Sequence, residues 1–201
     1  MSLKTIFKDA RIVALAGNKS TGKSNNLIRL IIEFRKKDQD TPIYAYGLDP
    51  KLDKLLNTLK VQVISSIEQL VYKKNCIIIL DEFQRLHFNT PKYRDELNAF
   101  VDFIYHSNCY CILSSPNIRE FNSIIGGVIE KWLLKSVRID QCINGSQLKK
   151  VIGAYQGCHN VMGSISLEKN QLLVINNDRE IVLKLNYVKQ ADTKLGLTKI
   201  F

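Results

Sequence analysis

A phosphate-binding loop near the N-terminus constrains this chain more than any other feature of its sequence. Residues 17–24 match the pattern GxxxxGK[ST]; they follow the apolar run 12–16 and precede a segment with helical periodicity. In such a loop successive backbone N–H groups point inward at phosphate oxygens, and the helix that follows adds the positive end of its dipole. The loop in its strand–loop–helix setting therefore predicts binding of a nucleoside triphosphate.

The residues of this loop have distinct expected roles. Gly17 and Gly22 allow backbone conformations that a Cβ disfavours. Lys23 is expected to reach the β- and γ-phosphates, and the Ser24 hydroxyl is expected to complete the ligand shell of a Mg²⁺ ion. The expected cofactors are therefore ATP and Mg²⁺. The predicted nucleotide-binding residues are Gly17, Asn18, Lys19, Ser20, Thr21, Gly22, Lys23 and Ser24.

Length and composition indicate one globular domain. The 201 residues suffice for one sizeable α/β domain, and 45% of them are hydrophobic. No segment approaches the roughly 18 uninterrupted apolar residues of a membrane span, and the N-terminus lacks the apolar stretch of a signal peptide. We therefore expect a single domain over 1–201, no membrane span and a cytoplasmic location.

The charge of the chain is strongly basic and unevenly distributed. The formal net charge is +10, and residues 131–201 carry eleven Lys and Arg against five Asp and Glu. Such an excess favours a polyanionic partner, because each neutralised phosphate releases counterions. Nucleic acid is the partner that this charge favours, and a solvated basic surface is the alternative.

The cysteines do not form the pattern of a zinc site. The chain has five, at positions 76, 109, 111, 142 and 158. Cys109 and Cys111 are expected on one face of a strand, but the second pair of ligands that a zinc site needs is missing. We therefore expect buried free thiols.

Strand and helix patterns alternate along most of the chain, which predicts an α/β fold with a mostly parallel sheet flanked by helices. Apolar runs predict strands at 11–16, 43–46, 61–64, 76–80, 109–113 and 132–139. Helical spacing predicts helices at 23–37, 51–58, 91–107 and 118–129, and a capping box at 65–68 predicts one more helix directly after it. Residues 171–175 and 181–185 flank a polar turn, which predicts a β-hairpin within about 170–188 that extends the core.

Two acidic residues directly follow the buried run 76–80. Asp81 and Glu82 would lie at the carboxyl edge of the sheet, where α/β proteins bind ligands. Asp81 is the expected partner of the Mg²⁺ ion, and Glu82 is expected to orient a water molecule or accept its proton during attack on the γ-phosphate. The pair therefore predicts hydrolysis of the bound nucleotide.

Three further residues are candidates for the catalytic site. The strand at 109–113 leads into a polar segment that ends at Asn117, which would sense the γ-phosphate if this strand lies between the other two. A simple helix-capping turn explains the same residues equally well. Arg119 and Arg138 are candidates for a charge-stabilising finger offered to a neighbouring subunit, and ordinary surface or phosphate contacts are the alternative.

These features together resemble the FtsK/HerA superfamily of DNA-pumping ATPases, and most closely the small genome-packaging ATPases of membrane-containing icosahedral viruses. The resemblance runs in order over most of the chain. It rests on the phosphate loop, on the Leu-Asp-Pro-Lys segment 48–51, on 76–82, on the strand end 112–115, on 132–151 and on the closing hairpin 170–188.

The chain also departs from that family in two places. The family usually ends its sensor strand with glutamine, whereas Ser115 and Asn117 stand in this stretch. Residues 145–150 have no arginine where FtsK-like motors place one. The resemblance therefore leaves the sensor and the finger unassigned, and Lys149 or Lys150 is an alternative contact to DNA.

The resemblance implies a P-loop NTPase domain of the RecA/ASCE kind and an ATP-driven translocase of double-stranded DNA that packages a viral genome. Its implied partners are DNA, other copies in a pentameric or hexameric ring, and a capsid vertex, in the host cytoplasm or on the virion. One alternative is a phosphotransferase of the thymidine-kinase type, because residues 81–84 also resemble part of such an enzyme. That class would need a four-cysteine zinc module, which these cysteines do not form. Another is a filamentous-phage assembly ATPase, which normally carries a transmembrane segment.

Overall fold

A computed structural model of the protein describes most of the first two thirds of the chain and parts of the remainder. The described residues are 6–86, 94–116, 120–121, 123–138, 160–161, 164–165, 167–168, 171–176 and 179–184. Among them, no helix combines the length and the apolar character needed to cross a membrane.

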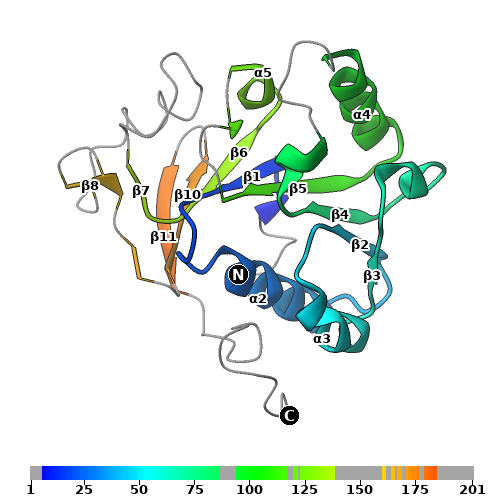
Figure 1. Ribbon diagram of the computed structural model, residues 1–201, viewed down its shortest axis with the longest axis horizontal. Helices are drawn as coiled ribbons and strands as arrows, with labels where there is room; N and C mark the ends of the chain where they lie inside the picture. The colour runs from blue at the N-terminus through cyan, green and yellow to red at the C-terminus, as the bar shows by residue number, and fades with distance from the viewer. Residues whose placement is uncertain are drawn as a thin grey trace.

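Eight of the described strands form one twisted sheet, and six of them run parallel to one another (Figure 1). The six are β1 (Ile12–Ala16), β2 (Ile43–Tyr46), β3 (Val61–Val63), β4 (Ile77–Leu80), β5 (Tyr110–Ser115) and β6 (Lys131–Leu134). The hairpin strands β10 (Gln171–Asn176) and β11 (Arg179–Lys184) complete the sheet, and β10 pairs antiparallel with β6. The predicted fold class is confirmed, and so is the closing hairpin.

The order of the strands across the sheet is β11-β10-β6-β1-β5-β4-β2-β3. Strand β5 therefore lies between β1, which leads into the phosphate loop, and β4, which leads into the acidic pair. Ser115 pairs with Ala16 on one side, and Leu113 pairs with Leu80 on the other. Because the strands are parallel, their carboxyl ends meet at one edge of the sheet, where ligands bind in open α/β folds.

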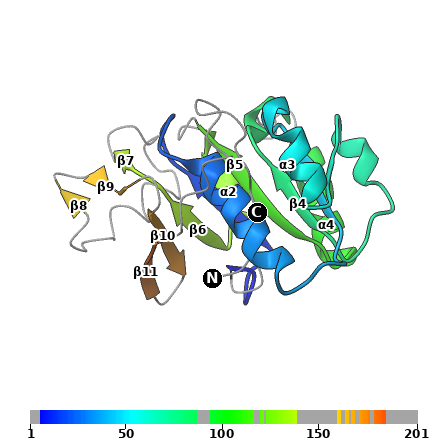
Figure 2. The same ribbon diagram turned by 90° about the horizontal axis from the view of Figure 1, so that it is seen from below.

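Helices cover both faces of the sheet, as Figures 1 and 2 show. Helices α2 (Lys23–Arg35) and α3 (Asp53–Thr58) pack on one face, and α4 (Arg94–His106) and α5 (Ser123–Gly126) on the other. The buried side chains of α2 are spaced as the sequence predicts, since Leu27, Leu30, Ile31 and Phe34 all face the core. Each face has its own apolar cluster, because the strands are buried on both sides.

Two of the predicted helices are shorter or of a different kind. The helix predicted at 118–129 covers only Ser123–Gly126 among the described residues, because two adjacent glycines at 126 and 127 disfavour its continuation. The capping box is shifted by one residue to Ser66 and Gln69, and it begins a 3₁₀ helix, Ile67–Leu70. Another 3₁₀ helix, Pro50–Leu52, leads into α3.

The strand predicted at 132–139 is in fact two strands in different sheets. β6 ends at Leu134, and β7 (Val137–Arg138) joins a small sheet with β8 (Asn160–Val161) and β9 (Ser164–Ile165). The break falls at Lys135 and Ser136. Lys135 still bonds to the last residue of β1, whereas Ser136 bonds to the phosphate loop. The Lys135 N–H donates to the Ala16 carbonyl at 2.8 Å, and the Ser136 carbonyl accepts from the Asn18 N–H at 3.3 Å.

Candidate nucleotide-binding site

The phosphate loop connects β1 to α2 at the carboxyl edge of the sheet. Gly22, directly before α2, has φ +89°, a conformation that favours glycine. Ser20 has φ +62°, so the loop backbone turns sharply twice. The Thr21 hydroxyl donates to the Asn18 carbonyl at 2.8 Å and ties the loop together. Gly22 has no side chain to cap α2. The positive N-terminal end of this helix is therefore left available to the loop and to a bound anion.

Gly17 is needed for a different reason from the one the sequence suggests. It does not adopt a positive φ; instead, a Cβ at this position would come within 2.5 Å of the Lys135 Cβ. The first glycine of the loop therefore allows the end of β6 to pack against the loop backbone.

Lys23 lies inside the loop and is mostly buried. Its Nζ donates to the Gly17 and Asn18 carbonyls, each at 2.8 Å. Burial lowers its pKa to about 8, although the negative charges of Asp81 and Glu82 favour the protonated form. An ammonium has three donors and these two carbonyls use two, so one donor is left for a phosphate oxygen.

Asp81 is held at the end of β4 by its neighbour β2. Its N–H donates to the Tyr46 carbonyl at 2.9 Å. Gly47 follows with φ +78°, and a Cβ there would lie 2.0 Å from the Asp81 carbonyl oxygen. The turn after β2 therefore requires glycine both for its backbone angle and for the close approach of Asp81.

Asp81 is 7% exposed, and its burial raises the pKa of its carboxyl group. The Ser114 hydroxyl on β5, Lys23 and the Glu82 N–H each act in the opposite direction. Ser114 Oγ is itself buried and makes no hydrogen bond within the described part of the chain. It lies close enough to Asp81 to lower the pKa but outside hydrogen-bonding geometry.

Glu82 adopts a strained backbone conformation for a residue with a side chain. Its φ is +54°, and its N–H donates to the Asp81 carboxylate at 3.2 Å. The short helix Phe83–Leu86 follows, and Arg85 on it forms an ion pair with the Glu82 carboxylate. The Glu82 carboxylate is thus held by Arg85 whereas that of Asp81 is buried, so the two acids are available for different tasks.

The structure brings together the main residues predicted from the sequence. Asp81 and Glu82 follow β4 at the same edge of the sheet as the phosphate loop, and their charges act on Lys23. Lys19 and Ser20 are exposed at the tip of the loop, and Ser24 is partly exposed on the first turn of α2. Asn117 and Arg119 lie outside the described residues. The backbone of Arg138 lies in β7 of the small sheet, and its side chain is not among those described.

The predicted ligands suit a magnesium ion. Mg²⁺ prefers oxygen donors, and here a Ser24 hydroxyl and a buried carboxyl, Asp81, lie beside a phosphate loop. The raised pKa of Asp81 reflects a carboxylate deprived of water, which a cation would stabilise in its charged form. The buried, unbonded Ser114 hydroxyl is a further oxygen next to this carboxyl.

Lys135 is the main site residue that the sequence analysis missed. Its side chain is fully buried, and its Nζ donates to the Glu168 carbonyl at 3.0 Å and to the Gln171 carbonyl at the start of β10. Burial and the nearby charge of Lys23 lower its pKa to about 8. Asn26 of α2 also donates to the Gln171 carbonyl, at 3.4 Å. The phosphate loop is thus joined to the hairpin through side chains from two elements.

Solved structures share this fold along nearly the whole chain. The genome packaging NTPase B204 from Sulfolobus turreted icosahedral virus 2, in complex with sulfate, has a TM-score of 0.58 at 15% identity, over 90% of this chain and 97% of that one. Its complex with ATP-gammaS gives 0.56 at 16% identity, over 89% and 98%. The resemblance expected from the sequence is therefore confirmed for the fold.

A second group of similar structures comes from larger bacterial proteins. EssC (ATPases 2 and 3) from Geobacillus thermodenitrificans has a TM-score of 0.54 at 13% identity, over 90% of this chain and 40% of that one. No family model and no curated protein sequence matches the chain. The likeness thus lies in the three-dimensional arrangement of the P-loop NTPase fold.

Proposed function

We propose that this protein is a Mg²⁺-dependent ATPase that translocates double-stranded DNA, with packaging of a viral genome as its role. The observation that carries the proposal is the position of β5 between β1 and β4. This order places the phosphate loop and Lys23 opposite the acidic pair, separated by one strand with a polar end. Binding of the triphosphate and activation of water are then possible in one site.

The side chains divide the work of hydrolysis in this proposal. The loop backbone, the N-terminus of α2 and Lys23 hold the phosphates and stabilise the charge that develops on them. Ser24 and Asp81 hold the Mg²⁺ ion, which supplies charge neutralisation when bound. Glu82 orients the attacking water and accepts its proton, once its carboxylate leaves Arg85.

Translocation of DNA is the finer part of the proposal. It is supported by the basic C-terminal third of the chain and by the likeness to a protein described as a genome packaging NTPase. We propose that copies of the chain form a ring of five or six around the DNA in the host cytoplasm and dock at a capsid vertex. Arg119 and Arg138 remain the proposed finger residues, and Asn117 the proposed sensor.

The direct test is hydrolysis of ATP by the wild type and by Glu82→Gln, each with and without double-stranded DNA. The wild type should hydrolyse ATP faster when DNA is present. Glu82→Gln should bind ATP but hydrolyse it at least roughly 100-fold more slowly, because the general base is lost. The exposed Glu96 of α4 offers a matched control, and Glu96→Gln should behave as the wild type.

Two outcomes would contradict the proposal. Hydrolysis that DNA does not stimulate would remove translocation and leave only an ATPase. Phosphoryl transfer to a nucleoside that survives Glu82→Gln would favour the phosphotransferase alternative.

A further inference from the structure

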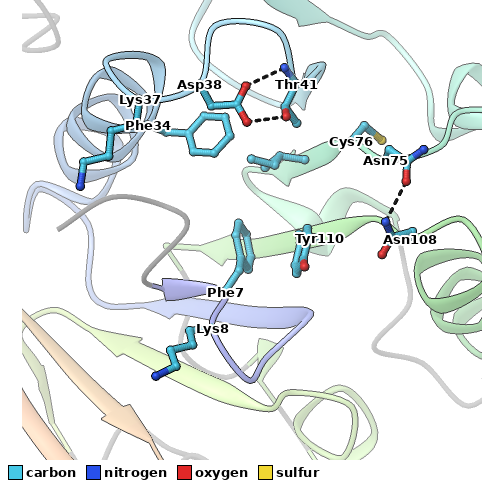
Figure 3. A pocket seen from close by; sticks show the side chains of 11 residues that line it. Phe7, Lys8, Phe34, Lys37, Asp38, Thr41, Asn75, Cys76, Asn108 and Tyr110 are labelled. Atoms are coloured by element: carbon cyan, nitrogen blue, oxygen red, sulfur yellow. Dashed lines mark hydrogen bonds between the residues drawn. The ribbon is translucent and has the colours of Figure 1, made fainter.

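A cavity of about 640 Å³ opens at the amino edge of the sheet, the edge opposite the phosphate loop (Figure 3). Three aromatic side chains, Phe7, Phe34 and Tyr110, form much of its wall. The rings of Phe7 and Tyr110 are 4.9 Å apart, so this wall is well packed. The rest of the wall comes from Lys8, from the segment between α2 and β2 and from residues at the starts of β4 and β5, one of which is Cys76.

Cys76 lies next to a second thiol, Cys109, which comes directly before the adjacent strand. Ile77 and Tyr110 are partners in the parallel pair β4–β5, so Cys76 and Cys109 are neighbours at the start of these strands. Their sulfur atoms lie 3.2 Å apart, and both residues are buried and free. Asn75 and Asn108 reinforce the junction through a 2.7 Å side-chain hydrogen bond. The two thiols are thus held against each other by backbone and side-chain contacts on both strands.

The surroundings favour one thiolate within the pair. The hydrogen bond from Cys76 lowers the pKa of Cys109 to about 7, and the same hydrogen bond raises the pKa of Cys76. Arg11 further favours the Cys109 thiolate, and its guanidinium donates to the Cys109 carbonyl at 3.3 Å. Cys111, two residues further along β5, is fully buried, and its burial raises its pKa. The pair therefore combines two sulfur atoms 3.2 Å apart with a favoured thiolate, which is the nucleophile in thiol oxidation, and Cys111 has neither.

We propose that Cys76 and Cys109 are a redox site that a hydroperoxide converts into a reversible disulfide. The cavity that Cys76 lines is the proposed route of the oxidant to the pair, and Cys109 lies behind Cys76, outside the cavity wall. The thiolate of the pair attacks the peroxide oxygen, gives a sulfenic acid and releases hydroxide, or an alcohol from an organic hydroperoxide. The second sulfur then displaces the sulfenic oxygen as water, so two electrons pass from the two sulfurs to the peroxide and a thiol reductant reverses the reaction.

The required movement is small. A disulfide has sulfur atoms about 2 Å apart, so the two sulfurs must approach by about 1 Å, at strand ends rather than within the ladder. The bond would close a loop that contains β4, the acidic pair and α4, and it would join the amino ends of β4 and β5. Because the site is at the edge of the sheet opposite the phosphate loop, its chemistry is independent of the proposed ATPase function.

The test uses the reduced full-length protein, treated with hydrogen peroxide, alkylated and then mapped by peptide mass spectrometry. We expect two alkylatable thiols to be lost, a peptide that links Cys76 to Cys109 with two hydrogen atoms fewer, and full recovery with dithiothreitol. Cys111→Ser is the matched control, because it removes a buried cysteine of the same strand and should leave the linkage intact.

The variants Cys76→Ser and Cys109→Ser should each abolish the linked peptide. Mapping of the wild type needs no variant, so a substitution that fails to fold does not prevent the test. The proposal is overturned if both cysteines remain alkylatable in folded, peroxide-treated protein. A linkage to Cys142 or Cys158 instead, or sulfinic and sulfonic products alone, would overturn it as well.

Discussion

The two edges of the central sheet differ in what they bury. The carboxyl edge buries charged groups, Lys23, Asp81 and Lys135, next to a residue with a strained backbone, Glu82. The amino edge buries aromatic rings and thiols around a cavity. Its two buried cations, Arg35 and Lys131, donate to backbone carbonyls instead of facing a buried acid among the described contacts. Buried charges lower stability unless a partner compensates them, whereas buried rings raise it.

The charged groups at the carboxyl edge lower the stability of the fold and supply the chemistry of the site. The shifted pKa values of Lys23 and Lys135 and the raised pKa of Asp81 are each caused first by burial, so the carboxyl edge is preorganised for a highly charged ligand. We therefore expect substitutions at the carboxyl edge to affect nucleotide binding and hydrolysis most. Substitutions at the amino edge should affect mainly the free energy of unfolding.

Gly47→Ala should have the largest effect, because it changes both stability and the site. The new Cβ would overlap the Asp81 carbonyl, and the positive φ disfavours alanine, so we expect the free energy of unfolding to fall by about 4 kcal/mol. Urea unfolding and ATP hydrolysis would be measured together. Asp49→Ala in the same turn is the control, and it should cost only the N-cap of the 3₁₀ helix, about 1 kcal/mol. Equal losses in the two variants would contradict the role of the Gly47–Asp81 contact.

Phe7→Ala tests the amino edge. Phe7 is 6% exposed and contacts Tyr110, so we expect the free energy of unfolding to fall by about 3 kcal/mol in urea denaturation. ATP hydrolysis by the folded variant should match that of the wild type. Impaired hydrolysis by a folded Phe7→Ala protein would show that the two edges are coupled. It would contradict the expectation that the amino edge affects mainly the free energy of unfolding.

Nucleotide binding should depend on pH through Lys23. Its pKa in the folded protein is lowered to about 8, so the side chain loses its proton as the pH rises above 8, and phosphate must then bind together with a proton. We expect ATP affinity to be about tenfold weaker at pH 9 than at pH 7, measured by calorimetry. In Lys23→Arg the guanidinium keeps its charge, so the affinity of that variant should change little over this range. An equal pH dependence in both proteins would assign the effect to another group.

Arg85→Ala should have the smallest effect. The Arg85 side chain is 61% exposed, so its ion pair with Glu82 is screened by water and contributes no more than about 0.5 kcal/mol to stability. ATP affinity should remain that of the wild type, because Arg85 contacts neither the loop nor Asp81 among the hydrogen bonds and ion pairs described. A larger loss of stability would mean that exposed charges at this edge also matter.

The periodicity of the sequence predicted most strands and helices correctly because each depends on local spacing of apolar residues. It was wrong at 132–139, where an alternating pattern continues but β6 ends at Leu134 and Ser136 bonds to the phosphate loop. The helix predicted at 118–129 was too long because two glycines outweigh the apolar pattern. Lys135 was missed although it directly follows a buried strand, the same position that identified Asp81.

The chemical groups of the site could be predicted from the amino-acid sequence alone. The phosphate loop and the acidic pair are each contiguous, so their residue types and spacing are visible in one short segment. Which segments meet became visible only in the folded protein: β5 lies between β1 and β4, Gly47 against Asp81, Lys135 against Gly17, and Cys76 against Cys109. These contacts join residues far apart in the chain, and the order of strands in a sheet follows from how all faces pack together and not from any local pattern.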